Sequence, residues 1–135
     1  MISCLHPKHV KGMYVPCNKC VLCKRNDSLN WQVRLSHEAL YHTHSLFITL
    51  TYDNDSLPKD YSFKKKDVQD WQKRLREHIS RKFGKEERIK FFTVPEGGDG
   101  RGIREEGKNP HYHSIILGKI SAEELKPIVD KTWKF

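Results

Sequence analysis

Residues 111–118 of the chain read His-Tyr-His-Ser-Ile-Ile-Leu-Gly. The aromatic and β-branched residues of this segment are typical of a strand, and Gly118 is expected to end it. Because alternate side chains of a strand point to the same face, His111 and His113 should lie about 7 Å apart on one face of a sheet. Two imidazoles in this arrangement are a workable pair of ligands for a metal ion.

A third ligand is expected from the strand that precedes this segment. Residues 88–94 are also rich in β-branched and aromatic residues, and Glu96 follows them directly. A β-hairpin that joins the two strands across a charged, glycine-rich loop at 97–108 would bring Glu96 alongside the two histidines. Two imidazoles and one carboxylate form a three-point metal site. The alternative is that both histidines are ordinary strand residues, since His-x-His occurs often by chance.

Working outward, the sequence predicts one further strand and three helices. The segment 46–52 has apolar side chains on both faces, which is typical of a central strand covered on each side. Helices are predicted from Asn26 to about residue 42, from Ser62 to about residue 83, and from a capping box at residues 121–124 in which Pro127 is an early kink or stop. Trp71 on the second helix, together with Trp31 and Phe92, is expected in the core.

The order of these elements predicts an α+β fold with an antiparallel sheet flanked by helices and an N-terminal cysteine-rich arm. We divide the chain into an arm at residues 1–25 and a nucleic-acid-binding domain at residues 26–135. The length of 135 residues suits one domain, and 36% hydrophobic residues with 10% aromatic residues exclude a disordered basic tail. No apolar run is long enough for a membrane span, and the N-terminus lacks a secretion signal, so a cytoplasmic location is expected.

The net charge of +8 favours a polyanionic partner, with nucleic acid as the first candidate. Much of the charge lies in and around the second predicted helix, since residues 59–90 hold 12 basic against 6 acidic residues. Charge alone is equally consistent with a solvated helix face and with phosphate contacts. The candidate phosphate-binding residues are Lys66, Lys73, Arg74 and Arg81.

All four cysteines lie within the first 23 residues, at Cys4, Cys17, Cys20 and Cys23. Without a secretion signal, this clustering favours a metal over disulfides. Four thiolates could hold a structural Zn²⁺, and three cysteines within seven residues are crowded enough that His6 or His9 could substitute for one of them. The alternative is a group of reduced thiols without a metal. Zinc is favoured because the arm has too few apolar residues to fold by burial.

Three segments together resemble one protein family. They are residues 15–23 with the Cys-x-x-Cys-x-x-Cys spacing, residues 47–58 with Thr-Leu-Thr-Tyr-Asp, and residues 109–118 with Pro-His-Tyr-His. In this order they resemble the rolling-circle replication initiation proteins of microviruses, in particular the gokushovirus-like and Chlamydia-phage-like branch. These initiators are HUH endonucleases, named for a His-hydrophobic-His strand whose middle position is Tyr112 here.

The resemblance implies an HUH or ferredoxin-like sheet on which His111, His113 and Glu96 hold Mg²⁺ or Mn²⁺. The ion would polarise a phosphodiester of single-stranded DNA at a phage-type origin while a tyrosine attacks it, in a bacterial host cell. Thr49 and Thr51 match the first motif of the family, whose implied role is structural and DNA-positioning.

Two departures from the family bear on catalysis. The family usually has Gly-Glu-Tyr-Gly and a short turn where this chain has Val94-Pro95-Glu96-Gly97-Gly98. Its nucleophilic tyrosines lie on a helix after the histidine strand, with a lysine one turn away, but no tyrosine follows Tyr112 here. Tyr61 does begin a Tyr-x-x-Lys sequence and is the remaining candidate nucleophile.

Three interpretations follow from these residues. The favoured one is the N-terminal part of a truncated initiator that binds single-stranded DNA and a divalent metal but is inactive alone. The second is a complete small nickase that uses Tyr61 or the tyrosine of a partner chain. The third is a zinc-stapled, non-catalytic nucleic-acid-binding adaptor in which His111 and His113 are ordinary strand residues.

Overall fold

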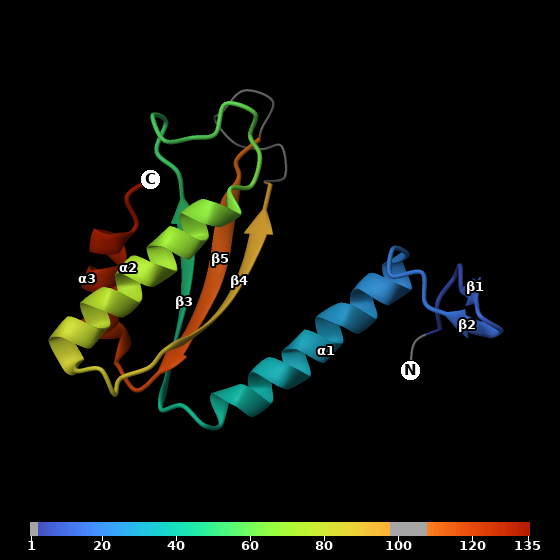
Figure 1. The fold of residues 1–135 in the computed structure, drawn as a ribbon, viewed down its shortest axis with the longest axis horizontal. Helices are drawn as coiled ribbons and strands as arrows, with labels where there is room; N and C mark the ends of the chain where they lie inside the picture. Colours follow the sequence, from blue (N-terminus) through green and yellow to red (C-terminus); the bar gives the residue numbers. More distant parts are fainter. Residues whose placement is uncertain (1–2, 98–107) are drawn as a thin grey trace. The chain divides into compact units, whose positions relative to one another are not determined.

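The computed structural model of the chain describes residues 3–97 and 108–135, so the predicted loop at 97–108 lies almost entirely outside the described residues. An α+β fold with antiparallel sheets and an N-terminal cysteine cluster is confirmed (Figure 1). The elements are β1 (Lys8–Val10), β2 (Met13–Val15), α1 (Val21–Ala39), β3 (His44–Thr51), α2 (Lys65–Phe83), β4 (Lys90–Glu96), β5 (His111–Gly118) and α3 (Ala122–Thr132). No helix among the described residues is long and apolar enough to cross a membrane.

The chain forms two compact units, Met1–Tyr41 and His42–Phe135. The first unit contains the β1–β2 hairpin and α1, so the first predicted helix groups with the cysteine arm. This helix begins at Val21, five residues before the predicted start at Asn26. The reason is its cap: the thiol of Cys20 accepts a hydrogen bond from the Cys23 amide at 3.5 Å, a role that Ser or Asp usually fills.

The first unit has almost no hydrophobic core. Among its described residues only Cys17 and Cys23 are buried, each 8% exposed. The prediction that Trp31 is a core residue is wrong, because its side chain is 37% exposed on α1 and stacks with Arg34. No apolar partner within the described part of this unit covers the stripe that the helical spacing suggested. Burial of apolar surface therefore contributes little to the stability of this unit.

The second unit contains a three-stranded antiparallel sheet in the order β3-β5-β4. The prediction that residues 46–52 form a central strand is wrong, since β5 is the central strand and β3 is at the edge. Leu46, Ile48 and Leu50 of β3 face the core, whereas Phe47 lies on the other face and is 65% exposed. The apolar residues on both faces of β3 therefore do not reflect two covered faces.

The helices α2 and α3 pack against one face of this sheet (Figure 1). As predicted, α2 presents Val68, Trp71, Leu75 and Ile79 to the core, where they meet Tyr112 and Ile116 of β5. The capping box of α3 is also present, since Ser121 Oγ accepts from the Glu124 amide at 3.3 Å. Pro127 does not stop α3, which continues to Thr132. No helix of this unit covers the opposite face of the sheet among the described residues, and we call it the open face.

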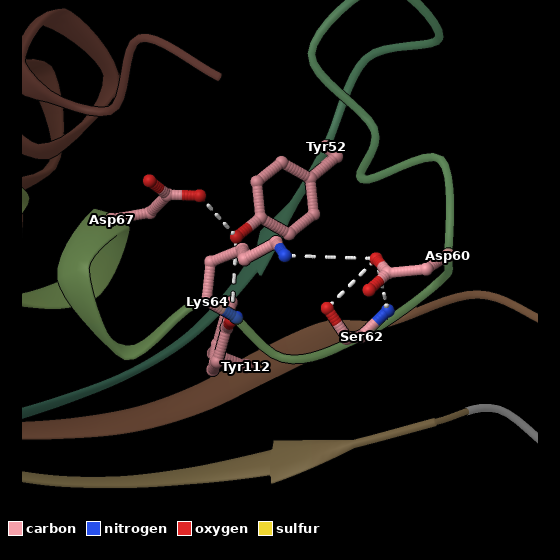
Figure 2. A network of polar contacts seen from close by, with 6 residues as sticks. All are labelled: Tyr52, Asp60, Ser62, Lys64, Asp67 and Tyr112. Carbon is pink, nitrogen blue, oxygen red and sulfur yellow. Dashed lines mark hydrogen bonds and ion pairs between the residues drawn. The ribbon is translucent and has the colours of Figure 1, made fainter.

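A chain of hydrogen bonds links the middle of β5 to the start of α2 (Figure 2). The Lys64 amide donates to Tyr112 Oη at 2.7 Å, and Tyr52 Oη donates to Asp67 Oδ2 at 2.8 Å. The two tyrosine hydroxyls are 3.3 Å apart, so Tyr112 donates to Tyr52. Burial raises the pKa of Tyr52, which keeps its hydroxyl protonated as the donor to Asp67. The hydroxyl of Tyr112 thus fixes α2 against the strand that carries the two histidines.

Replacing Tyr112 by phenylalanine is expected to lower the free energy of unfolding of the second unit by about 1–3 kcal/mol, because the Lys64 amide and the Tyr52 hydroxyl both lose a buried partner. Urea denaturation followed by the fluorescence of buried Trp71 measures the effect. Tyr41→Phe is the matched control, since Tyr41 is 82% exposed. Equal stability of the Tyr112→Phe and control variants would show that these hydrogen bonds contribute nothing.

Candidate metal centre

The sheet register brings the predicted ligands together on the open face. His111 lies opposite Glu96 of β4, and His113 lies opposite Val94 of β4 and Thr49 of β3. Tyr112, between the histidines, points into the core, so both imidazoles point to the open face. The hairpin that the sequence predicted between residues 88–94 and 111–117 therefore exists, and it aligns Glu96 with His111.

The ligand atoms of these three residues converge. His113 Nε2 is 2.9 Å from Glu96 Oε2 and 3.2 Å from His111 Nε2, and His111 Nε2 is 3.7 Å from the same carboxylate oxygen. In a metal site with bonds of about 2.0–2.2 Å, neighbouring ligand atoms are about 3.0–3.5 Å apart. We call Glu96, His111 and His113 the metal triad. The two imidazoles are mostly buried while the carboxylate is 56% exposed, which leaves one side of the triad open to solvent.

Both imidazoles are oriented by a hydrogen bond at the second ring nitrogen. His111 Nδ1 donates to the carbonyl of Asn109 at 2.7 Å, which leaves its Nε2 lone pair facing the triad. His113 Nδ1 is 3.0 Å from the Thr49 hydroxyl. That hydroxyl can accept from Nδ1 when Nε2 binds a metal. Such outer contacts fix the tautomer and ring orientation of metal-binding histidines.

Replacing Thr49 by valine is expected to weaken Mn²⁺ binding at the triad by about 10-fold or more, because His113 loses the acceptor for its Nδ1 proton. Titration calorimetry with Mn²⁺ measures the change. Thr49→Ser should restore the affinity, and Thr51→Val is the matched control on the same face of the same strand. If Thr49→Val binds Mn²⁺ as tightly as the wild type, the hydroxyl does not orient His113.

The predicted phosphate-binding residues lie elsewhere. Lys66, Lys73 and Arg81 are exposed on α2, on the opposite side of the sheet from the metal triad. Arg74 is half-buried instead: its Nε donates to the Thr132 carbonyl at 2.9 Å, and its guanidinium lies 5.2 Å from the centre of the Phe135 ring. Of the residues matched to the first motif, only Thr49 contacts the triad, while Thr51 is exposed opposite His111.

Tyr61 lies in the loop between β3 and α2, which leaves the sheet at the end that holds Thr51 and His111. Its φ of +52° is unusual for a bulky residue. The Lys108 ammonium is 5.8 Å from the centre of its ring, three residues before His111. Tyr61 is therefore near the metal triad along the chain, although no hydrogen bond joins them among the described contacts.

The four cysteines form a second cluster, in the first unit. Their Sγ atoms all lie within 4.8 Å of one another, and the distances Cys4–Cys20 and Cys17–Cys23 are both 3.9 Å. A tetrahedral zinc site with Zn–S bonds of about 2.3 Å has sulfur atoms about 3.8 Å apart. The cluster contains neither His6 nor His9, and His9 instead packs its ring against Tyr14. We call these four cysteines the thiol cluster.

Backbone amides surround the thiol cluster and favour thiolates. The Cys17 amide donates to Cys4 Sγ at 3.2 Å, and the Lys19 and Cys20 amides donate to Cys17 Sγ. Amides of Cys23 and Leu5 lower the pKa of Cys20 to about 6, and the amides on Cys17 lower its pKa as well. Burial raises the pKa of Cys23 to about 12. A bound cation would offset that cost of burying a charged thiolate.

Comparison with known proteins identifies the family. The model of the family described as Replication-associated protein ORF2 matches residues 45–135, which include most of β3, all of β4 and β5, and the metal triad. The chain belongs to this family.

Its curated relatives are phage proteins, as the sequence motifs predicted. The chain is 36% identical over 118 residues to Replication-associated protein ORF4 of Chlamydia phage 1, covering 84% of this chain and 27% of that protein. It is 32% identical to Replication-associated protein VP4 of Bdellovibrio phage phiMH2K over 82% of this chain and 33% of that protein. For Replication-associated protein ORF2 of Spiroplasma virus 4 the identity is 31%, over 93% of this chain and 38% of that protein. This replication-associated chain therefore spans between a quarter and two fifths of their lengths. No solved structure matches it.

Proposed function

We propose that this chain is the metal- and DNA-binding part of a rolling-circle replication initiator of the HUH endonuclease type. The observation that carries the proposal is the metal triad, in which three ligand atoms converge on the open face of the sheet. Membership of a replication-associated family supports DNA as the partner. The exposed side of the triad leaves room for a phosphate oxygen as a further ligand, a requirement of any catalytic metal site.

The two clusters are proposed to bind different metals. Two imidazoles and an exposed carboxylate suit Mg²⁺ or Mn²⁺, whereas four thiolates are soft ligands that suit Zn²⁺. At the triad, a bound cation supplies positive charge that polarises a phosphodiester. Glu96 and the two histidines hold that charge in place, while Thr49 and the Asn109 carbonyl keep the imidazoles oriented. The zinc at the thiol cluster is proposed to be structural.

The complete cleavage reaction is proposed for the longer relatives rather than for these 135 residues, since the chain covers only 27–38% of their lengths. The favoured proposal is a chain that binds single-stranded DNA without forming a covalent product. The second candidate is a nickase that uses Tyr61, which the strained backbone of Tyr61 and its place beside Lys108 favour. A protein-linked 5′ end that disappears in Tyr61→Phe would establish the second candidate.

The test of the proposed function is binding of fluorescent oligonucleotides to the whole chain, with either Mn²⁺ or EDTA present. We expect single-stranded DNA to bind more tightly in Mn²⁺, because a cation at the triad adds a phosphate contact. Duplex DNA should show a smaller effect. Equal affinity in Mn²⁺ and EDTA would contradict the proposal and favour the zinc-stapled adaptor.

The exposed basic residues of α2 are proposed as a separate, sequence-independent phosphate-binding surface. Because this surface and the metal triad lie on opposite sides of the sheet, their contributions should be separable. Alanine at Lys73 and Arg81 is expected to reduce the slope of log affinity against log salt by about 0.7 for each phosphate that the protein no longer neutralises. Mn²⁺ dependence should persist in this double variant. An unchanged slope would show that this face of α2 is only solvated.

A further inference from the structure

An apolar row lies beside the metal triad on the open face. Phe47 of β3, Ile115 of β5 and Phe92 of β4 are paired across the sheet, so their side chains form one row. The next row along the strands holds Thr49, His113 and Val94, about 7 Å away. The apolar row is therefore the immediate neighbour of the triad on the side of His113.

Phe47 is the most exposed member of this row. Its ring is 65% exposed, whereas Ile115 and Phe92 are half-buried. Its ring also stacks on the imidazole of His113, with the ring centres 5.4 Å apart and the planes inclined by 16°. One π-face of Phe47 is thus turned toward a ligand of the triad, and most of the remaining ring surface is open to solvent.

Isolated apolar residues on a surface are ordinary, and exposure alone indicates no ligand. The position of Phe47 is what distinguishes it from the other exposed aromatic residues. A phosphodiester held at the triad carries a nucleoside on each side, and its bases must lie within reach of the neighbouring row. An aromatic ring in that position can stack with any base, because every base has a π-face.

We propose that Phe47 is a base-stacking residue, which receives one nucleobase next to the phosphodiester held at the metal triad. Ile115 and Phe92 form the apolar surface on which that base rests. The inference rests on the proposed function, since the triad must first hold a phosphate. It adds a subsite for the base that is tolerant of sequence, and it gives Phe47 a role that neither metal binding nor the core requires.

The experiment uses two oligonucleotides of about nine units, one made only of abasic units and one with a single central thymidine. With only one base available, the oligonucleotide can slide until that base reaches the subsite. In Mn²⁺ we expect the thymidine to improve binding to the wild type by about 10-fold. The improvement should fall below about twofold in Phe47→Ala and return in Phe47→Trp, since stacking needs an aromatic face.

Two controls keep the result specific. Phe47→Leu retains an apolar side chain of similar size and should lose most of the improvement without loss of stability in urea. Tyr41→Ala removes an aromatic residue that is 82% exposed outside the sheet and should keep the full improvement.

The inference is overturned if the thymidine improves binding equally in the wild type and in Phe47→Ala. That outcome would also be expected if another segment of a longer protein covers Phe47. It would leave the proposed function standing, provided that the abasic oligonucleotide still binds in a Mn²⁺-dependent way. If the abasic oligonucleotide shows no Mn²⁺ dependence, the proposed function fails, and the stacking proposal fails with it.

Discussion

Replacing His113 by alanine is expected to abolish measurable Mn²⁺ binding at the metal triad and the Mn²⁺-dependent part of DNA binding. His113 is the central member of the triad, because its Nε2 is the atom within 3.2 Å of both His111 Nε2 and Glu96 Oε2. Loss of a direct ligand should exceed the roughly 10- to 100-fold effect typical of losing an outer-shell partner. Electron paramagnetic resonance of free Mn²⁺ and titration calorimetry both measure this loss.

The matched control is His44→Ala. His44 belongs to the neighbouring strand but lies opposite Gly118, at the far end of the sheet from the triad, and it is exposed. Its replacement should leave Mn²⁺ affinity unchanged. Urea denaturation should show that both variants are folded, since neither imidazole is part of the hydrophobic core. Undiminished Mn²⁺ binding by His113→Ala would rule out the triad as the site.

Removal of zinc from the thiol cluster is expected to unfold the first unit and leave the second unit folded. The described residues of the first unit bury only two side chains, and both are cysteines. For such a unit the free energy of metal binding, about 10–16 kcal/mol in small zinc domains, is the free energy of folding. The 19-residue helix α1 is only marginally stable by itself, so it should unfold together with the cluster.

Amide hydrogen exchange with and without a strong zinc chelator measures this effect separately in each unit. Protection should disappear along α1 and persist in β5 and α2, whose core includes Trp71, Leu75 and Ile116. Cys23→Ser should reproduce the chelated state, and His9→Ala should behave as wild type because His9 lies outside the cluster. Equal protection of α1 with and without chelator would contradict a structural metal.

The sequence predicts the parts of the fold that depend on local pattern. The period of α2, the His111–Leu117 strand and the approach of Glu96 to the histidines all follow from spacing along one or two adjacent elements. The edge position of β3 does not, because strand order depends on which partner each edge finds elsewhere in the chain. The predicted start of α1 is also too late, since a thiol caps this helix and the position of that thiol depends on the cluster.

Residues that act through another side chain are the hardest to assign from sequence. Thr49 matches a DNA-positioning motif, but its contact with His113 becomes visible only once the register of β3 on β5 is known. Arg74 groups with the basic residues of α2 by charge, yet α3 and the segment after it engage its guanidinium. In both cases the decisive hydrogen bond joins residues more than about 50 positions apart, beyond the range of any local pattern.

The tyrosine between the two histidines also constrains how this family can vary. A merely hydrophobic middle residue could be exchanged for leucine or valine, but the hydroxyl of Tyr112 is shared with Tyr52 and the Lys64 amide. We therefore expect positions 52, 67 and 112 to covary among relatives, so that loss of one hydroxyl is accompanied by loss of its partners. Such covariation would record, across many phage genomes, that the strand of the metal triad is tied to α2 from behind.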